Sequence, residues 1–198
     1  MLDGYVYKVN KFLRRKSMPD VNITNMSRTK KIVIMGLAAA IMVCIGKFSI
    51  HINLFGFTAI KVGFGFVMTF LISTQIDPIS GALVAAVADL VHSLLFPIGP
   101  YFPGFTLTSF LSGLLVGYLY RAMIKIYKGK VTFVSCFIPT VITKVFIAVL
   151  NTVWLWLIFS KTPFLILLGH RVVVDFLVGV ILSPICFYLA KYSKHVIT

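Results

Sequence analysis

The chain of 198 residues contains no glutamate, and its five acidic residues are all aspartates. Asp89 and His92 are three residues apart, so a helix would place two potential metal ligands on one face. No second pair of acidic or histidine residues has a matching spacing, whereas a protein metal site usually takes three or four such ligands. We therefore expect neither a metal ion nor any other cofactor.

Motifs for nucleotide hydrolysis and for common hydrolytic enzymes are also missing. Neither Gly46-Lys47 nor Gly129-Lys130 is followed by Ser or Thr in a G-x-x-x-x-G-K-[ST] frame, so the Walker A phosphate loop is absent. Neither a G-x-S-x-G elbow nor an H-E-x-x-H motif occurs. We expect that the protein is not an enzyme and cannot hydrolyse ATP through a Walker A loop.

Only three cysteines occur, and all of them lie in apolar runs: Cys44, Cys136 and Cys186. No two of them have the short spacing that is typical of zinc or redox motifs. We interpret all three as small residues buried in the protein interior.

Long apolar runs dominate the chain. Apolar residues make up 59% of the sequence and the mean hydropathy is +0.99, which is too apolar for a water-soluble domain. A helix that crosses a membrane needs about 20 mostly apolar residues. Six runs meet this need, at 32–50, 59–76, 78–96, 105–123, 132–159 and 163–191. The sequence predicts an all-α membrane protein with six transmembrane helices in a domain at 32–194.

The basic residues indicate the orientation in the membrane. Most of the 19 lysines and arginines lie in the arm 1–31, in the link between the fourth and fifth runs, or after residue 190. Because cytoplasmic segments are rich in Lys and Arg, we expect both termini in the cytoplasm. The arm 1–31 is either a short helix on the anionic membrane surface or a disordered segment that only sets topology.

Four charged residues lie inside the predicted spans and away from the span ends, namely Asp89, Lys144, Arg171 and Asp175. A charge within a bilayer is costly and marks either a functional site or a paired structural contact. From the rise of a helix, Asp89 and Arg171 fall in the outer half of the membrane. Two interpretations remain open: an outward-facing solute site, or structural ion pairs of Asp89 with Lys144 and of Arg171 with Asp175.

The segment 81–117 contains two apolar runs around an uncharged loop rich in Pro, Gly and aromatic residues at 96–104. Asp77 and Pro78 precede the first run and suit the N-cap and the first position of a helix. We interpret this segment as two helices whose loop covers a small-molecule site. The loop's prolines limit its conformational freedom, which suits a lid of fixed shape.

Small residues form three stripes at helical spacing: Gly36, Ala40 and Cys44; Ala82 and Ala86; Ser109, Gly113 and Gly117. Such stripes let two membrane helices approach closely. They serve either packing within the bundle or docking onto another membrane protein, and three stripes in so small a protein favour a partner.

Four segments carry a family resemblance: GKFSIHINLFGFTAIKVGFGF, ISGALVAAVADLVHSLLFPIGPYFPGFTLTSFLSGLLVGYLY, LNTVWL and HRVVVDF. Over 29–194 the chain resembles the folate-family substrate-binding (S) components of energy-coupling factor (ECF) vitamin transporters. The resemblance implies a bacterial plasma-membrane protein that binds folate or a related vitamin from outside. It also implies assembly with an EcfT-like coupling subunit and two ATPase subunits, and gating by the loops at 47–61 and 96–104.

Individual residues follow from this resemblance and from the chemistry of folate, which has a flat pterin, an aromatic linker and two carboxylates. The expected ligand contacts are Lys47, Lys61, Phe64, Asp89, Tyr101, Phe102, Asn151, Trp154 and Arg171. The expected docking face for the coupling subunit consists of Gly36, Ala39, Ala40 and Cys44. A different vitamin, a small membrane enzyme and an accessory protein without a ligand remain as alternatives.

Overall fold

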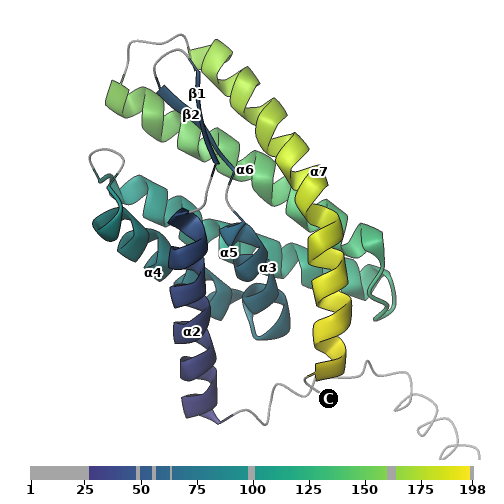
Figure 1. Cartoon of the computed structure of the whole chain (residues 1–198). Coiled ribbons are helices and arrows are strands. Elements are labelled where there is room, and N and C mark those ends of the chain that lie inside the picture. The colour runs from purple at the N-terminus through teal and green to yellow at the C-terminus, as the bar shows by residue number, and fades with distance from the viewer. Residues whose placement is uncertain are drawn as a thin grey trace, which may run out of the picture.

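The computed structural model describes residues 27–47, 50–54, 57–62, 64–97, 101–159 and 164–196. Its elements are α2 (Arg28–Lys47), β1 (Ile50–Leu54), β2 (Phe57–Val62), α3 (Gly65–Gln75), α4 (Pro78–Leu95), α5 (Pro103–Ile126), α6 (Phe133–Phe159) and α7 (Phe164–Val196). Within these ranges every helix except α3 is long and apolar enough to cross a membrane (Figure 1). The predicted long apolar helices are therefore present, although five of them in the described ranges, not six, have the length of a membrane span. Most of the basic arm lies outside the described residues.

The helix expected over 59–76 is wrong in its first part. Residues Phe57–Val62 form a strand, and α3 contains only 11 residues. At about 1.5 Å per residue, α3 is about 16 Å long, roughly half of the hydrocarbon thickness. Glycines at positions 56, 63 and 65 surround the strand, and glycine disfavours a continuous helix.

Strands β1 and β2 form an antiparallel hairpin, so the all-α prediction is incomplete. Ile50 pairs with Val62 and Leu54 with Phe57, and the register shifts after Ile52, where β2 contains one additional residue. The hairpin contacts α7 through β2 and lies at the end of the molecule where α2 ends (Figure 1). Within the loop expected at 47–61, residues 50–54 and 57–61 therefore belong to strands.

Helix α3 lies at the centre of the helical bundle, where it contacts α2, α4, α5 and α7. Its Phe70 is fully buried and packs edge-on against Tyr120 of α5, with the ring centroids 5.6 Å apart. Large apolar side chains on the outer surface, such as Ile32, Leu165 and Ile181, remain exposed. Since water would disfavour so much apolar surface, this outer surface suits lipid.

The three stripes of small residues have different environments. A Cβ atom on Gly113 would lie 2.6 Å from the Ala82 Cα, and one on Gly117 would lie 2.9 Å from the Pro78 Cα. The stripes of α4 and α5 therefore pack against each other inside the bundle. A Cβ atom on Gly36 would meet nothing within 4 Å, so the stripe of α2 has no partner among the described residues.

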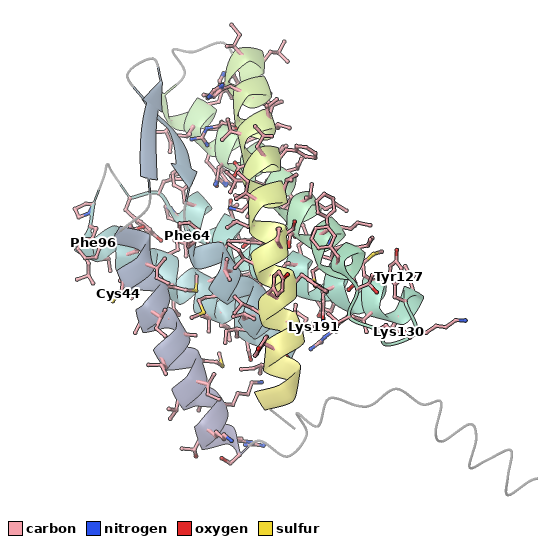
Figure 2. The ribbon with its side chains drawn as sticks, turned by 45° about the vertical axis from the view of Figure 1, so that its right-hand side comes forward. Cys44, Phe64, Phe96, Tyr127, Lys130 and Lys191 are labelled. Carbon is pink, nitrogen blue, oxygen red and sulfur yellow. The ribbon has the colours of Figure 1, made fainter. Side chains whose placement is uncertain are left out.

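The cysteines differ in the same way. Cys136 and Cys186 are buried, as expected, and they belong to the main apolar core. The prediction is wrong for Cys44, which is exposed on α2 (Figure 2). In a membrane protein an apolar side chain need not be buried in its own chain, because lipid or another membrane protein can cover it.

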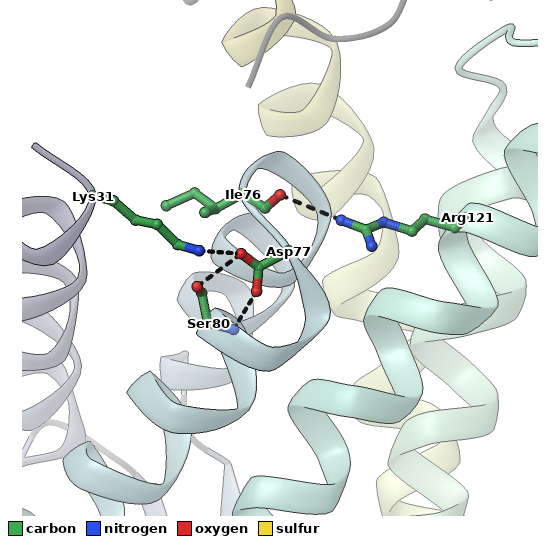
Figure 3. A network of polar contacts seen from close by, with 5 residues as sticks. All are labelled: Lys31, Ile76, Asp77, Ser80 and Arg121. Carbon is green, nitrogen blue, oxygen red and sulfur yellow. Dashed lines mark hydrogen bonds and ion pairs between the residues drawn. The ribbon is translucent and has the colours of Figure 1, made fainter. Parts of the chain in front are cut away.

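An ion pair connects the start of α4 to α2 (Figure 3). Asp77 is the predicted N-cap: its Oδ1 accepts a hydrogen bond from the Ser80 backbone N at 2.6 Å, and Lys31 of α2 forms an ion pair with its Oδ2. Partial burial by itself raises the pKa of Asp77, but the hydrogen bonds from Lys31 and Ser80 outweigh it and lower the pKa. The starts of α2 and α4 therefore lie at the same end of the molecule.

Substitution of Gly113 tests the contact between α4 and α5. Gly113→Ala should lower the free energy of unfolding by about 1–3 kcal/mol, because the new methyl group collides with backbone. Gly36→Ala is the matched control, since its methyl group meets no atom within 4 Å and should not destabilise. Unfolding by sodium dodecyl sulfate in detergent micelles measures the free energy of unfolding of both variants. Equal stability of the two variants would contradict the packing described.

Candidate functional site

Aromatic side chains gather around the first turn of α5. The Phe102 ring, at the N-cap of α5, lies 5.6 Å from the Trp154 ring of α6 and 6.1 Å from the Phe105 ring. Gly104 makes this approach possible, because a Cβ atom there would lie 2.4 Å from Phe102 Cε1 and 2.7 Å from Trp154 Cδ2. Three aromatic rings from two helices thus form one cluster next to a glycine.

The orientation of Trp154 is set by a hydrogen bond. Its Nε1 donates to Thr108 Oγ1 at 2.9 Å, and the Thr108 hydroxyl donates to the Gly104 carbonyl at 3.0 Å. The polar edge of the indole is therefore satisfied within the protein, as is usual for a buried tryptophan. What the indole offers to a ligand is a flat apolar surface for stacking.

Asp89 lies beside this cluster and is held by a second chain of hydrogen bonds. The Thr106 hydroxyl donates to Asp89 Oδ2 at 2.8 Å, and the Tyr101 hydroxyl lies 3.0 Å from the same Thr106 oxygen. Three elements meet here: α4, the segment before α5, and α5 itself. The carboxylate thus lies next to a tyrosine whose side chain is 44% exposed.

Asn151 carries a polar atom that the protein leaves without a partner. Its Oδ1 is buried, and within the described residues it has no hydrogen-bond partner. A buried acceptor without a partner typically costs about 1–3 kcal/mol. Asn151 precedes Trp154 by three residues on α6, so both point to the same side of that helix. This arrangement suits a donor group supplied by a ligand.

The remaining intramembrane charges form a separate group between α6 and α7. Lys144 is buried, and its Nζ lies 4.9 Å from the centre of the Phe66 ring. Asp175 interacts electrostatically with both Lys144 and Arg171. The suggested pairing of Asp89 with Lys144 is wrong, since Asp89 accepts a hydrogen bond from Thr106 and the carboxylate that attracts Lys144 is that of Asp175. Asp175 also attracts Arg171, which agrees with the suggested interaction of these two residues.

The predicted ligand contacts are thus only partly brought together. Asp89, Tyr101, Phe102 and Trp154 lie around the start of α5, whereas Arg171 belongs to the charged group. Phe64 stands at the N-cap of α3, is 45% exposed, and makes no ring contact with this cluster among the described residues (Figure 2). The side chain of Lys47 lies outside the described part, as does that of Lys61, which is paired with His51 in the hairpin register.

Sequence reasoning missed two residues of the site and left one unassigned. Thr106 and Thr108 were missed, although both are hydroxyl residues in an apolar run directly after the aromatic loop. His92, which had no assigned role, is buried against α2: a Cβ atom on Gly46 would lie 2.5 Å from its Cδ2. His92 therefore contributes to the contact between α4 and α2.

The docking residues predicted on α2 differ in exposure. Gly36, Ala40 and Cys44 are exposed, whereas Ala39 is half-buried. Ala39 packs against a small core in which Ala38 is buried with Ile72, Ile76 and Val84. One side of the helix is thus packed in the bundle, while a Cβ atom on Gly36 would meet no described atom within 4 Å.

Comparison with known proteins gives one family. A sequence model described as "ECF transporter, substrate-specific component" matches residues 30–190. A folate transporter FolT from Clostridium novyi (strain NT) is 30% identical over 103 residues, 52% of this chain and 56% of the relative. A FolT from Leuconostoc mesenteroides subsp. mesenteroides is 26% identical over 92 residues, 46% of this chain and 47% of the relative. The chain therefore spans about half the length of the curated relatives it matches.

Two solved structures are similar over most of the chain. A structure described as FolT bound with folic acid has a TM-score of 0.66 and 29% identity, covering 84% of this chain and 94% of that one. A structure of the S component of a bacterial ECF transporter has a TM-score of 0.68 and 18% identity, covering 87% and 99%. At that identity, the second structure supports the fold alone.

Gly104→Ala tests the aromatic cluster. The new methyl group should displace the Phe102 and Trp154 rings, because it would approach both to well under van der Waals distance. In a Trp156→Phe background, which leaves Trp154 as the only tryptophan, we expect a shift of its fluorescence emission. Gly169→Ala is the control, since its methyl group meets nothing within 4 Å. Unchanged emission in the Gly104 variant would contradict the cluster.

Proposed function

Because the chain belongs to the family of substrate-specific components of ECF transporters, we propose that it binds folate with high affinity for uptake into the cell. The observation that carries this ligand is the similarity to a structure of FolT bound with folic acid, which extends over nearly all of that protein. The polar and aromatic groups around the start of α5 support the proposal, because they match the chemistry of folate.

Each part of folate has a counterpart among the described side chains. The flat pterin and the aromatic linker would stack on Tyr101, Phe102 and Trp154. The amino-pyrimidine edge of the pterin would donate hydrogen bonds to two acceptors. These are the buried Oδ1 of Asn151 and a carboxylate oxygen of Asp89. Arg171 suits the two carboxylates of the glutamate part, because a guanidinium group binds a carboxylate through two parallel hydrogen bonds. Lys47 and Phe64 are the further contacts that we propose for the bound state.

The proposed topology has six crossings of the bacterial plasma membrane with both termini in the cytoplasm. The ion pair of Lys31 with Asp77 supports it, because the start of α4 then lies at the same end as the start of α2. The chain must therefore return between these two residues, and β1, β2 and the short α3 form that return path (Figure 1). The basic residues near the two termini and in the link between α5 and α6 favour the cytoplasmic side.

Because the sequence lacks a Walker A loop, energy from ATP hydrolysis would have to come from other subunits. We propose that an EcfT-like coupling subunit and two ATPase subunits supply the energy. Gly36, Ala39, Ala40 and Cys44 form the proposed docking face on α2. The exposure of Gly36, Ala40 and Cys44 supports this face, as does the open space at Gly36, where the backbone of another helix can approach closely.

Folate binding to the purified protein tests the proposed ligand, and Arg171 tests its orientation. Arg171→Gln should weaken folate binding roughly 10- to 100-fold, because it removes a charged hydrogen bond worth about 1.5–3 kcal/mol. Binding of pteroic acid, which lacks the glutamate part, should change little. Isothermal titration calorimetry measures both ligands.

Arg121→Gln is the matched control, because Arg121 donates to the Ile76 carbonyl at the other end of the bundle and should leave both affinities unchanged. If the wild-type protein does not bind folate but binds another vitamin, the protein is an S component for that other vitamin. An equal loss for folate and pteroic acid would place Arg171 away from the carboxylates.

The docking face is tested by enlarging its small residues. Gly36→Leu combined with Ala40→Leu should abolish co-purification with the coupling subunit, because the larger side chains keep the two helices apart. Folate binding should remain, since both positions are exposed and away from the aromatic cluster. Gly169→Leu, at another exposed glycine, is the control and should preserve the complex. A complex that survives the double substitution would refute this face.

A further inference from the structure

We propose that Thr106 is a positioning residue of the ligand site: it joins Asp89 of α4 to Tyr101 and thereby sets the angle at which the chain enters α5. This inference deepens the proposed function, on which it rests for the identity of the ligand. It changes the assignment of Asp89, whose Oδ2 is engaged with the protein itself.

Tyr101 and Thr106 occupy two defined positions at the start of helix α5. Phe102 is the N-cap of α5 and Pro103 is its first helical residue, so Tyr101 is the residue before the cap and Thr106 is the fourth residue of the helix. In many helices an apolar contact between these two positions fixes the direction in which the chain enters. Here a hydrogen bond between Tyr101 and Thr106, 3.0 Å long, takes the place of the apolar contact.

The single hydrogen of the Thr106 hydroxyl sets the direction of both hydrogen bonds. A threonine hydroxyl has one hydrogen, and Thr106 donates it to the carboxylate of Asp89. The tyrosine hydroxyl must therefore be the donor in its contact with Thr106. The chain runs from Tyr101 through Thr106 to Asp89, and the carboxylate is the final acceptor. Loss of the Thr106 hydroxyl consequently breaks both bonds at once.

The Asp89 carboxylate also acts electrostatically on the start of α5. No side chain caps the start of α5, and its first turn contains no acidic residue. The first backbone N–H groups of a helix carry partial positive charge and favour a nearby anion. Through Thr106, Asp89 brings a carboxylate from the neighbouring helix α4 close to this end. The negative charge inside the membrane therefore stabilises the start of α5 in addition to holding Tyr101.

The aromatic cluster is attached to the same part of α5. Phe102 lies directly between Tyr101 and the first turn of α5, and its ring contacts Trp154. A parallel bond, from Trp154 to Thr108, attaches α6 to the same part of α5. The start of α5 is therefore fixed to α4 through Thr106 and to α6 through Thr108. A change at Thr106 should move Tyr101 and Phe102 together, so it should alter ligand release.

The experiment compares Thr106→Val, which keeps the shape but removes the hydroxyl, with Thr106→Ser, which retains it. In the ligand-free protein, hydrogen–deuterium exchange of the peptide containing residues 102–108 should be faster in Thr106→Val and normal in Thr106→Ser. The folate dissociation rate should rise about fivefold in Thr106→Val, because the hydrogen bonds that hold Tyr101 in place beside the ligand are lost. Stopped-flow fluorescence measures this rate.

Two further variants complete the test. Tyr101→Phe removes only the outer bond of the chain and should reproduce the faster exchange, so it serves if Thr106→Val does not fold. Thr74→Val is the matched control, because the Thr74 hydroxyl donates only to carbonyls of its own helix, those of Phe70 and Leu71. It should leave exchange at 102–108 and folate release unchanged.

The outcomes separate this inference from the proposed function. If the wild-type protein does not bind folate, the proposed ligand is wrong, while the exchange experiment still decides the role of Thr106. If folate binds and Thr106→Val matches the wild type in both exchange and release, the positioning role is overturned. A Thr106→Ser variant as fast as Thr106→Val would also overturn it, since the hydroxyl would then have no effect.

Discussion

The backbones of α4 and α5 approach each other at Gly113 and Gly117, where any side chain would collide with Ala82 or Pro78. Because helices are rigid over this length, the contact also sets the separation of their other ends, where α4 carries Asp89 and α5 begins. The hydrogen bond from Thr106 to Asp89 requires that separation. Glycines more than one helical turn from the site thus determine whether its polar groups can meet.

A second constraint comes from the membrane, in which a polar group without a partner is costly. Several hydroxyl groups in the described helices are satisfied locally: Thr74, Ser93, Thr108 and Thr152 each donate to a carbonyl four residues earlier. Others are not, since the buried hydroxyls of Ser73 and Thr143 have no hydrogen-bond partner among the described residues. Next to the aromatic cluster, Thr106 donates to another helix and the Asn151 Oδ1 has no partner within the described ranges. A ligand's polar groups can be received there.

Much of the fold could be predicted because membrane helices depend on local composition. The apolar runs at 78–96 and 132–159 differ by one residue at an end from the helices Pro78–Leu95 and Phe133–Phe159. The N-cap at Asp77 was predictable for the same reason, since capping involves only adjacent residues. The hairpin was not, because strands β1 and β2 are short, apolar and partly aromatic. Hydrophobicity alone does not distinguish such strands from part of a helix.

By itself, the sequence determined the class of protein, the positions of the long helices and the chemical types that a ligand site would need. Only the tertiary structure decided which small residues face inward and which remain exposed, as the contrast of Gly113 with Gly36 demonstrates. It also decided that Asp89 bonds to Thr106 and that Lys144 interacts with Asp175. The physical reason is that such contacts depend on how each helix is rotated and placed against its neighbours, which residue spacing along one helix does not specify.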